Sequence, residues 1–503
     1  MKPVFTYEQI AYQLTDAGQA FFGESRQSFN VPSSKTLFYD ASDLNEAGRI
    51  FTRAAFDTWT AVSGINFVES FFLADIVLND GFGGEQAFAE TVTNAAGDII
   101  FAEVTITRDW IRDDWTRTAT GQVVVDFDSY SMQTFVHEIG HALGLAHAGD
   151  YNGNASFQAD AHYANDSWQT TIMSYFPQDE NPNVDADFAY IMTPMIADII
   201  AIQDLYGIRP SAFVGDTIYG FNGNTGSYLD DLVDADNPIA FTIYDSLGND
   251  TVDVSGFTMN QSIDLRPEVF SDVAGLRGNM VIAPFVEIEN AIAGAGDDTV
   301  QGNDFANVLS GNAGDDRIDG GLGNDQIQGG LDNDHLSGDG GRDTLQSFAG
   351  VNTMNGGADD DQLFGGFQAD ALFGGAGNDA LRGDMGNGFL SGSDTLDGGT
   401  GDDVLMGAGG ADTFIFRPGD GSDTIGRFDP TGTTALPITV LGADFTTGQD
   451  KIALDGFTGV SASNVMSFVS DTGNGAAFQA QGTQITFFDL GRGALSADDF
   501  IFL

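Results

Sequence analysis

The 503-residue sequence carries 74 acidic and 18 basic residues, a formal net charge of −56, together with 42% hydrophobic residues and no cysteine. This charge disfavours nucleic acid and anionic membranes as partners, and the hydrophobic content excludes a disordered acidic polymer. The lack of cysteine excludes disulfides and thiolate metal sites, and the length predicts two or three domains.

The N-terminal segment Met1–Gln13 lacks the apolar core of a secretory signal peptide, so Sec export is not expected. No window reaches the roughly 18 apolar residues of a membrane span, and no stable membrane association is predicted.

Residues 1–210 are predicted to form a mixed α/β domain. A helical period covers Ser42–Trp59, with Ser42 as the expected N-cap, and a second helix precedes His147. A closing helix is expected over Pro194–Tyr206, with Gly207 as its C-terminal cap. Alternating apolar runs predict strands at Thr36–Tyr39, Ile65–Glu69, Asp75–Leu78 and Asp98–Ile106.

The segment His137-Glu138-Ile139-Gly140-His141 places two imidazoles on one face of the helix that precedes His147. Gly144 allows the chain to turn and bring His147 round as a third nitrogen ligand. Three nitrogen ligands leave one position open for water, which is the arrangement of a catalytic zinc site. Glu138 would then take the proton from the zinc-bound water as that water attacks a peptide carbonyl.

A tight turn at Thr171–Tyr175 would place Met173 as an apolar floor under the imidazoles. Taken alone, Met173 would be interpreted as an ordinary core residue, and only the presence of the histidines favours the floor. His162 lies between the two motifs and is expected to be a surface residue, or one that supports a ligand, because three histidines already complete the site.

Residues 211–290 are predicted to be a β-rich connecting part, with strands at Ile239–Tyr244 and Thr251–Val254. Residues 421–503 are expected to form a C-terminal β region that includes a β-sandwich. Its candidate strands are Thr439–Leu441, Lys451–Leu454 and Thr483–Phe488.

Residues 291–420 contain no Lys and no Glu, and an apolar residue recurs every nine positions from Val300 to Leu381. Such repeats predict an all-β parallel β-roll, in which glycines turn and the apolar residues face inward. Carboxylate and carbonyl oxygens suit calcium, and several structural Ca²⁺ ions are expected. The candidate ligands recur two places before the apolar residue: Asp298, Asp316, Asp325, Asp334, Asp343, Asp361, Asp370, Asp379, Asp394, Asp403 and Asp412.

The catalytic half resembles the serralysin-type metzincins, bacterial zinc peptidases of family M10 that carry RTX calcium-binding repeats. The matching stretches are HEIGHALGLAH from His137, GDYN from Gly149, IMSY from Ile172 and DIIAIQDLYG from Asp198. The resemblance implies one catalytic zinc, a catalytic role for Tyr175 and a structural role for Met173. One departure is Ala148, where many relatives carry Pro.

The resemblance also extends to the segment Tyr244–Asp253, which is similar to the first calcium loop of the family. It implies that Asp245 and Asp250 are calcium ligands and that Asp216 is a weaker candidate. Asp499–Leu503 fits the signal for type I export, although it could also be a terminal strand. The resemblance thus implies a secreted, extracellular monomer that meets protein or peptide substrates, the type I secretion apparatus and a small protein inhibitor.

Three functions were weighed against one another. The leading one is an endopeptidase whose substrate pairs with an edge strand near Asp98–Ile106. The second is a non-enzymatic calcium-dependent adhesin, which predicts a degraded zinc site. The third is a repeat-bearing lipase, which would need the Gly-x-Ser-x-Gly nucleophile motif that the sequence lacks.

Overall fold

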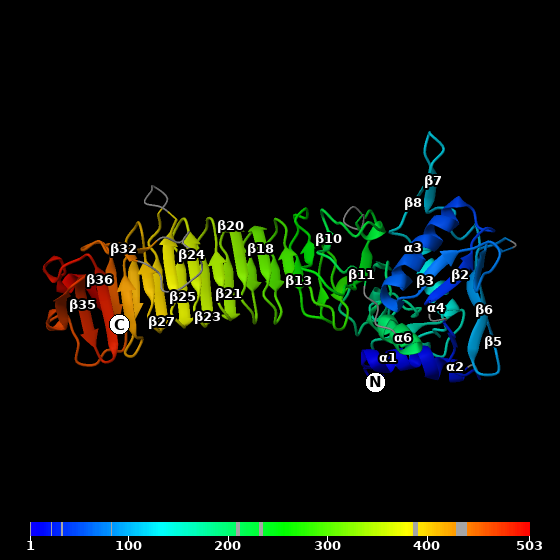
Figure 1. Cartoon of the computed structure of the whole chain (residues 1–503), viewed down its shortest axis with the longest axis horizontal. Helices are drawn as coiled ribbons and strands as arrows, with labels where there is room; N and C mark the ends of the chain where they lie inside the picture. Colours follow the sequence, from blue (N-terminus) through cyan, green and yellow to red (C-terminus); the bar gives the residue numbers. More distant parts are fainter. Residues whose placement is uncertain are drawn as a thin grey trace. The chain divides into compact units, whose positions relative to one another are not determined.

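The computed structural model describes residues 2–21, 23–31, 34–81, 83–207, 212–230, 235–385, 391–428 and 440–503 (Figure 1). The chain divides into two compact units, which we describe separately. The first holds residues 1–253 and 266–288, and the second holds residues 254–265 and 289–503. The predicted boundary at residues 210 and 211 lies outside the described residues. The first unit extends well past it because β11 (Ile239–Ile243) pairs with β9 (Tyr190–Ile191).

The first unit is built on a twisted sheet with the strand order β1-β6-β4-β2-β3, and β5 pairs antiparallel with β6. The four strands predicted in this region are present to within one residue at each end. Their bounds, with those of the two strands that the sequence did not predict, are β1 (Ser28–Phe29), β2 (Thr36–Asp40), β3 (Asn66–Glu69), β4 (Ile76–Asn79), β5 (Ala87–Thr93) and β6 (Asp98–Ile106).

The substrate is expected to pair with an edge strand near Asp98–Ile106, but Asp98–Ile106 is not itself that edge. These residues form β6, whose backbone pairs with β4 and β1 on one side and with β5 on the other. The edge strand is β5, which the sequence pattern did not reveal because its side chains are exposed or only half-buried throughout.

Helix α3 begins later than predicted. It spans Glu46–Ser63, and its N-cap is Asn45, whose Oδ1 accepts the backbone N–H of Gly48 at 2.9 Å. Ser42 instead donates its backbone N–H to Asp40 in a preceding turn, so it is not the cap. The helical period itself is real, because Ala47, Phe51, Ala55 and Trp59 recur along one face of α3 and are buried, and α3 packs against the helix at Tyr130–Ala142.

The other helices of the first unit frame the zinc motif. Helix α6 ends at Gly207 in the left-handed conformation, with φ of 63°, as predicted. Their bounds are α1 (Tyr7–Tyr12), η1 (Gln13–Ala17), α2 (Gly18–Phe21), α4 (Tyr130–Ala142), α5 (Phe157–Asp160), η2 (Gln178–Glu180) and α6 (Ile196–Tyr206). In the described ranges, no helix combines the length and the apolar character needed to cross a bilayer.

The remaining strands of the first unit form small sheets and hairpins. Strand β7 pairs antiparallel with β8, β10 pairs parallel with β12, and β15 lies between β11 and β14. Their bounds are β7 (Trp115–Arg117), β8 (Val123–Val125), β10 (Ile218–Gly220), β12 (Thr251–Asp253), β14 (Phe270–Ser271) and β15 (Met280–Ile282).

In the second unit, consecutive strands alternate between two parallel sheets (Figure 1). A residue therefore pairs with the residue 18 positions later, as Leu309 does with Ile327 and Ile318 with Leu336. All ten apolar residues of the nine-residue period, from Val300 to Leu381, are at most 1% exposed. The apolar positions thus face inward, because each turn of chain adds one strand to each sheet.

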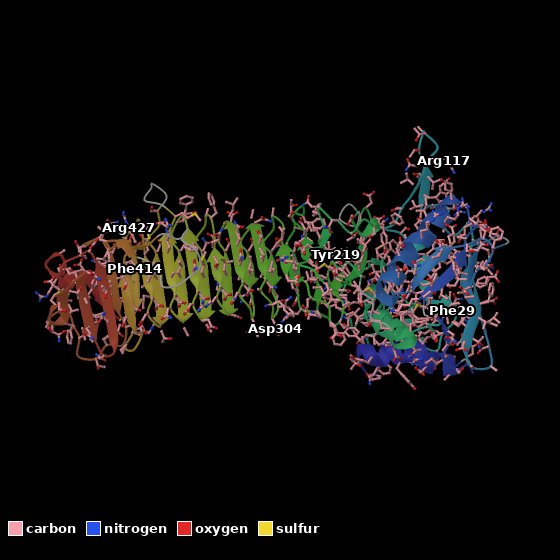
Figure 2. The ribbon with its side chains drawn as sticks, viewed as in Figure 1. Phe29, Arg117, Tyr219, Asp304, Phe414 and Arg427 are labelled. Atoms are coloured by element: carbon pink, nitrogen blue, oxygen red, sulfur yellow. The ribbon has the colours of Figure 1, made fainter. Side chains whose placement is uncertain are left out.

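One sheet of this unit runs β16-β18-β20-β22-β24-β26-β28-β30-β36-β35-β34, and the other runs β13-β17-β19-β21-β23-β25-β27-β29-β33-β37. The bounds in the repeats are β13 (Ser262–Asp264), β16 (Asn290–Ile292), β17 (Thr299–Gln301), β18 (Val308–Ala313), β19 (Arg317–Asp319), β20 (Gln326–Leu331), β21 (His335–Gly340), β22 (Thr344–Gln346), β23 (Thr353–Ala358), β24 (Gln362–Gly366), β25 (Ala371–Ala376), β26 (Ala380–Asp384), β27 (Thr395–Thr400), β28 (Val404–Met406) and β29 (Thr413–Phe416). Phe414 of β29 (Figure 2) is fully buried.

The strands after residue 421 extend the same two sheets. Strand β33 pairs parallel with β29, and β36 pairs parallel with β30. The predicted boundary at residue 420 is therefore not a boundary between sheets. The bounds are β30 (Ser422–Ile425), β31 (Arg427–Phe428), β32 (Val440–Gly442), β33 (Lys451–Leu454), β34 (Val469–Thr472), β35 (Gly475–Ala480), β36 (Thr483–Phe488) and β37 (Phe500–Phe502), with short helices η4 (Val465–Ser467), η5 (Arg492–Ala494) and η6 (Ala497–Asp499). The predicted strands Lys451–Leu454 and Thr483–Phe488 have the same bounds as β33 and β36. Thr439, the first residue of the third predicted strand, lies outside the described residues.

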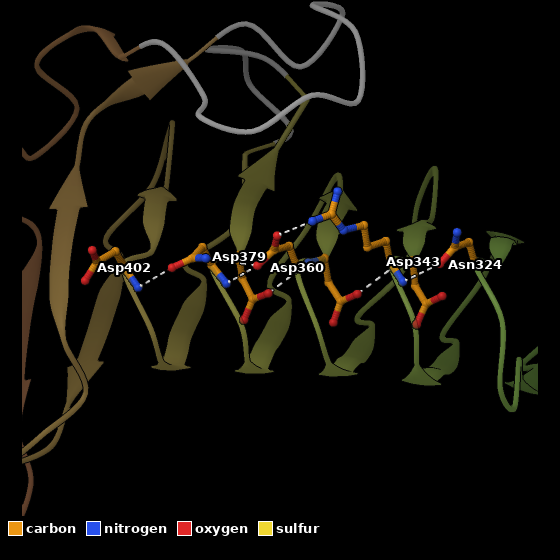
Figure 3. A network of polar contacts seen from close by, with 8 residues as sticks. Asn324, Asp343, Asp360, Asp379 and Asp402 are labelled. Atoms are coloured by element: carbon orange, nitrogen blue, oxygen red, sulfur yellow. Dashed lines mark hydrogen bonds and ion pairs between the residues drawn. The ribbon is translucent and has the colours of Figure 1, made fainter.

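Side-chain ladders tie the turns of the repeats together (Figure 3). In one ladder, Oδ1 of Asp361 accepts the backbone N–H of Asp343 at 2.9 Å, and Asp379 does the same for Asp361 at 2.8 Å. A second ladder runs the other way, since Oδ1 of Asp360 accepts the backbone N–H of Asn378 at 2.8 Å. Both ladders step 18 or more residues along the chain and fix the register of neighbouring turns.

Candidate active site

Helix α4 carries the first two histidines. Ser129 caps its start, since Oγ of Ser129 accepts the backbone N–H of Met132 at 3.3 Å. At the other end Gly144 has φ of 103°, and a Cβ there would lie 2.3 Å from the carbonyl oxygen of Gln27. Only glycine fits this turn without strain, and the turn directs the chain toward His147.

The Nε2 atom of His141 lies 3.1 Å from Nε2 of His137 and 3.0 Å from Nε2 of His147, so the three imidazoles converge on one point. The Nδ1 atom of His137 lies 2.7 Å from the carbonyl oxygen of Ile172, and that of His141 lies 2.7 Å from the carbonyl oxygen of Leu145. A carbonyl oxygen can only accept, so both rings carry the proton on Nδ1 and present the lone pair of Nε2.

Burial keeps these imidazoles neutral. It lowers the pKa of His137 to about 4 and that of His141 to about 3, and it lowers the pKa of His147 well below its ordinary value. The neutral imidazole is the form that binds a metal. Three convergent neutral nitrogens therefore fit a zinc ion, and no group has to lose a proton near neutral pH for the ion to bind.

Glu138 lies beside the histidines and is 7% exposed. Burial raises the pKa of Glu138 to about 8. Its Oε2 atom has no hydrogen-bond partner in the part of the chain that the structure describes. An unpaired carboxyl oxygen of raised pKa beside a metal centre is suited to accepting and returning a proton.

The predicted methionine turn lies under the centre. Met173 is fully buried, and its Sδ lies 2.9 Å from the position of a Cβ built on Gly140 of the zinc helix. The ring of Tyr175 lies 4.5 Å from that of His147 and 6.2 Å from that of His137, measured between centroids. The structure thus brings the ring of Tyr175 next to His147 and His137, and it packs Met173 against Gly140 of the helix that carries two of the histidines.

Two buried carboxylates that the sequence analysis did not select hold this turn. Asp198 of α6 accepts the hydroxyl of Thr171 at 2.5 Å and the backbone N–H of Ile172 at 2.8 Å. Asp166 accepts the hydroxyl of Ser174 at 2.7 Å and that of Tyr151 at 3.2 Å. The only feature of the sequence that pointed to either carboxylate is the position of Asp198 in the first turn of α6.

His162 is not one of the converging histidines. Its Nε2 lies 3.3 Å from a carboxylate oxygen of Asp150, and its side chain is 41% exposed. The structure therefore places it at the surface, as expected from the sequence.

The centre opens into a cleft along the edge strand β5. Two hollows meet at Glu138 and Tyr175, one of about 440 Å³ and one of about 660 Å³. The larger hollow is lined by residues 87–92 of β5 and by His141 and His147. Among the described strands β5 pairs only with β6, so its other edge borders the three histidines and is suited to binding an extended peptide as a further strand.

The carboxylates predicted to bind calcium are buried in rows. Those of the repeats are all at most 3% exposed: Asp298, Asp316, Asp325, Asp334, Asp343, Asp361, Asp370, Asp379, Asp394, Asp403 and Asp412. Eight of them leave Oδ2 without a hydrogen-bond partner in the described ranges: Asp316, Asp325, Asp343, Asp361, Asp370, Asp379, Asp394 and Asp403. Burial, with nearby carboxylates in addition, raises the pKa of Asp361 and of Asp394 to about 8.

The surroundings of these oxygens fit a cation. A Cβ built on Gly311 would lie 2.1 Å from Oδ2 of Asp316 and 2.8 Å from the carbonyl oxygen of Gly329, so both oxygens face the same space. Buried carboxylate and carbonyl oxygens together are the ligands that calcium prefers. Asp334 differs, because its Oδ2 already accepts the hydroxyl of Ser347 at 2.8 Å.

Other carboxylates of this kind lie outside the predicted ligand positions. Asp384, Asp423 and Asp444 each keep an unpartnered oxygen in the described ranges. They lie outside the repeat pattern because Asp384 stands where the repeat otherwise has glycine, and because Asp423 and Asp444 follow the last regular repeat.

The predicted ligands before the repeats are also buried. Asp245 is 3% and Asp250 1% exposed. The hydroxyl of Tyr219 (Figure 2) donates to Asp245 at 2.7 Å, and Asp250 accepts the backbone N–H of Thr217 at 2.8 Å. Asp216 accepts the backbone N–H of Asn249 at 3.1 Å.

Two family models match the chain. The one described as Peptidase M10 serralysin C terminal matches residues 210–488, and the one described as Metallo-peptidase family M12B Reprolysin-like matches residues 88–199. The second match contains the three histidines and the methionine turn. Together the two models therefore cover the candidate active site and most of the repeats.

Among similar proteins, Serralysin of Photorhabdus laumondii is 40% identical over 312 residues, which are 59% of this chain and 62% of that protein. Metallopeptidase AprA of Pseudomonas marginalis is 37% identical over 330 residues, 61% of this chain and 67% of its own. Serralysin C of Dickeya chrysanthemi is 49% identical over 174 residues, 34% of this chain and 36% of its own. The chain thus spans about two thirds or less of the length of these relatives.

A solved structure, the extracellular lipase LipA of Serratia marcescens, covers 42% of this chain and 40% of its own at 19% identity, with a TM-score of 0.22. That similarity is too low to inform the fold or the function.

Proposed function

Because this chain belongs to the M10 serralysin family of metallopeptidases, we propose that it is a secreted zinc endopeptidase that calcium stabilises. The observation that carries the proposal is the convergence of three neutral Nε2 atoms beside the unpaired carboxyl oxygen of Glu138. Among the described residues the cluster consists of the three histidines without a carboxylate, which leaves room for water and a substrate carbonyl.

In this proposal His137, His141 and His147 hold the zinc ion through Nε2. When bound, zinc acts as a Lewis acid that polarises a peptide carbonyl and acidifies water. The backbone carbonyls of Ile172 and Leu145 keep two of the rings in the tautomer and orientation that binding requires.

Glu138 is the proposed general base and acid. Its Oε2 takes a proton from the attacking water and later delivers it to the nitrogen of the leaving amine, so the carboxyl returns to its starting state. The pKa of about 8 that burial gives Glu138 in the metal-free chain suits a group that must also donate. Tyr175 is proposed to donate its hydroxyl to the substrate carbonyl oxygen as negative charge develops there.

The substrate is proposed to be an extended protein segment that pairs with the free edge of β5. Support comes from the larger hollow, which residues 87–92 border along the metal centre. Backbone pairing is independent of side chains and would therefore allow many proteins to be cut.

The second unit is proposed to be a calcium-bound parallel β-roll. Its support is the row of unpaired Oδ2 atoms and the adjacent glycine carbonyls. We further propose that the chain reaches the medium through a type I apparatus, because repeats that need calcium would stay unfolded at low cytosolic calcium. A small protein inhibitor that enters the cleft would be a fitting partner.

The test is hydrolysis of casein by purified wild type, by Glu138→Ala and by wild type treated with a zinc chelator in excess calcium. We expect both the Glu138→Ala substitution and the zinc chelator to abolish hydrolysis while the far-UV circular dichroism stays unchanged. Full activity of Glu138→Ala would refute the role of Glu138. A wild type that cuts no protein at all would refute the peptidase and favour the calcium-dependent adhesin.

A further inference from the structure

A further hollow of the first unit, of about 600 Å³, runs along helix α6, and we call it the α6 hollow. None of its described lining residues lines either hollow of the candidate active site. Its volume lies in the range of about 300–1,000 Å³ in which proteins bind small ligands and short segments of other chains. The α6 hollow is therefore large enough to be a binding site of its own.

Two helices form one part of the α6 hollow. Ile199, Gln203 and Gly207 are spaced four residues apart and share one face of α6. Helix α1 packs against α6 (Figure 1) and contributes Glu8 from its first turn. A carboxylate thus stands beside an apolar helix face.

A strand pair forms the other part. Strands β14 and β15 are antiparallel, with Phe270 opposite Val281, so the residues just before β14 and just after β15 lie at the same end of the pair. Those residues are Glu268, Pro284 and Phe285, and all three line the α6 hollow. A second carboxylate therefore reaches the hollow together with an aromatic ring.

The floor of the α6 hollow is apolar and held in place. Ile199 is 2% exposed. The Nε2 atom of Gln203 donates to the carbonyl oxygen of Val62 at 3.3 Å and to the hydroxyl oxygen of Tyr244 at 3.1 Å. Both bonds use the amide nitrogen, so what Gln203 can offer a ligand is its acceptor oxygen.

The charge of the α6 hollow is negative and not balanced from within. Glu8 and Glu268 form no ion pair in the part of the chain that the structure describes, and no lysine or arginine is among the described lining residues. Burial, with the charge of Glu8 in addition, raises the pKa of Glu268. Asp204, a third carboxylate of the lining, is already paired with Arg26 at 2.7 Å. Glu8 and Glu268 are thus the carboxylates left to attract a cation.

Phe285 is placed against its own preferences. Its side chain is 78% exposed, and its φ of 64° is a backbone conformation that bulky residues rarely adopt and glycine adopts freely. Strained residues of this kind gather at ligand sites, where contact with the ligand offsets the strain. The exposed ring of Phe285 is therefore a candidate contact for the group that Glu8 and Glu268 attract.

We propose that the α6 hollow binds the side chain of an arginine in an exposed segment of a partner protein. A guanidinium can donate to the carboxylates of Glu8 and Glu268 while its planar face stacks on the ring of Phe285. The aliphatic part of the arginine then lies along the apolar floor. The net charge of −56 draws basic segments toward the chain. The inference goes beyond the proposed peptidase function and does not depend on it.

The first test is isothermal titration calorimetry with the calcium-loaded full chain, carrying Glu138→Ala so that no ligand is cut. The probes are acetyl-Leu-Arg-amide, its Lys and Gln counterparts, and spermine. We expect the Arg dipeptide to bind about ten-fold more tightly than the Gln dipeptide. It should bind about three-fold more tightly than the Lys dipeptide, which can neither stack nor form a paired contact. Equal binding of the Arg and Gln dipeptides would overturn the proposal, and spermine that binds as tightly as the Arg dipeptide would replace it with a general cation site.

Carboxylate variants locate the binding. Glu8→Gln and Glu268→Gln should each weaken binding of the Arg dipeptide about five-fold and leave that of the Gln dipeptide unchanged. The matched control is Glu287→Gln, which changes the charge equally at an exposed residue outside the lining. It should leave both affinities at the level of the unsubstituted chain. A Glu8→Gln, Glu268→Gln double variant that still binds the Arg dipeptide as before would contradict the assignment.

Phe285→Gly separates a ligand contact from a structural role. It should weaken binding of the Arg dipeptide about three-fold. Thermal unfolding should not be lowered, because glycine adopts the backbone conformation of Phe285 without strain. A lower unfolding temperature with unchanged binding would show that the ring supports the fold alone and would overturn its part in the site.

Casein hydrolysis keeps this inference apart from the proposed function. With Glu138 intact, Glu268→Gln and Phe285→Gly should cut casein at the wild-type rate, because neither residue lines the hollows at the histidines. A chain that binds the Arg dipeptide but cuts no protein would refute the peptidase and leave the arginine site standing. A chain that cuts casein but binds the Arg and Gln dipeptides equally would refute the arginine site alone.

Discussion

The histidine cluster of the first unit and the carboxylate rows of the second unit, the two regions for which we propose metal ions, differ in charge and in hydrogen bonding. The histidines are neutral, and hydrogen bonds to backbone carbonyls already fix two of their rings. The aspartates are stacked one above another, and eight of them keep a buried oxygen without a partner in the described ranges. We therefore expect the first site to persist without an ion, whereas we propose that the second unit needs cations to offset the cost of burying like charges.

Removal of calcium should have the largest effect. With a calcium-selective chelator the second unit should lose most of its β-structure, because the aspartate rows would be buried without counter-charge. Removal of zinc alone should leave the circular dichroism of the whole chain nearly unchanged. If the circular dichroism of β-structure persisted without calcium, the aspartate rows would be stable without cations, and the two units would not differ in this respect.

The turn after α4 gives the next largest effect. Gly144→Ala should destabilise the first unit by about 3 kcal/mol or more, because the new Cβ would lie against the carbonyl oxygen of Gln27 in a left-handed backbone. The control is Gly121→Ala, which has a similar φ of 90° and no atom within 4 Å of the new Cβ. It should cost about 1 kcal/mol. Similar losses in thermal unfolding for both variants would mean that the contact with Gln27 is unimportant.

Tyr175→Phe tests the proposed donor without altering the packing of the turn. We expect kcat on a peptide substrate to fall about 10–100-fold with little change in KM, because one donor to the developing charge is lost. Zinc content should stay at the wild-type level. An unchanged kcat would remove Tyr175 from the proposed mechanism.

The smallest expected effect concerns the buried support of the methionine turn. Burial raises the pKa of Asp198 to about 7, above its unfolded value of about 3.9. The folded chain therefore binds the extra proton between these values, and the contribution of Asp198 to stability falls as pH rises from about 4 to about 7. Asp198→Asn should reduce the dependence of the free energy of unfolding on pH in this range. It should change that free energy by about 1 kcal/mol.

The control for that measurement is Asp198→Ala, which removes the acceptor for Thr171 and Ile172. It should destabilise the fold at every pH by about 1–3 kcal/mol. A stability curve of Asp198→Asn that keeps the wild-type slope would show that Asp198 does not titrate in this range.

Much of the fold could be read from periodicity. The nine-residue repeat predicted the inward apolar rows and the recurring aspartates, which the structure shows to be buried, because each repeat is one strand and one turn. The zinc motif was readable because HExxH fixes two side chains on one helix face, and Gly144 marked the turn toward His147.

The features that the sequence did not reveal depend on contacts between distant segments. Strand β5 has no apolar alternation, so its place at the sheet edge emerges only from pairing with β6. Asp166 and Asp198 are isolated acids in the sequence, and their roles follow from hydroxyls and amides that folding brings to them. Ser42 and Asn45 are both residues that can cap a helix, so the sequence did not show that Asn45, three residues after Ser42, is the N-cap of α3.

The most direct test of the account is X-ray absorption at the zinc edge on purified protein that holds calcium, together with the zinc content per chain. We predict one zinc per chain, bound by three imidazole nitrogens, and loss of that zinc in His147→Ala. A chain that binds no zinc, or binds it through the carboxylates of the repeats with His147→Ala unaffected, would contradict the metal centre and the function built on it.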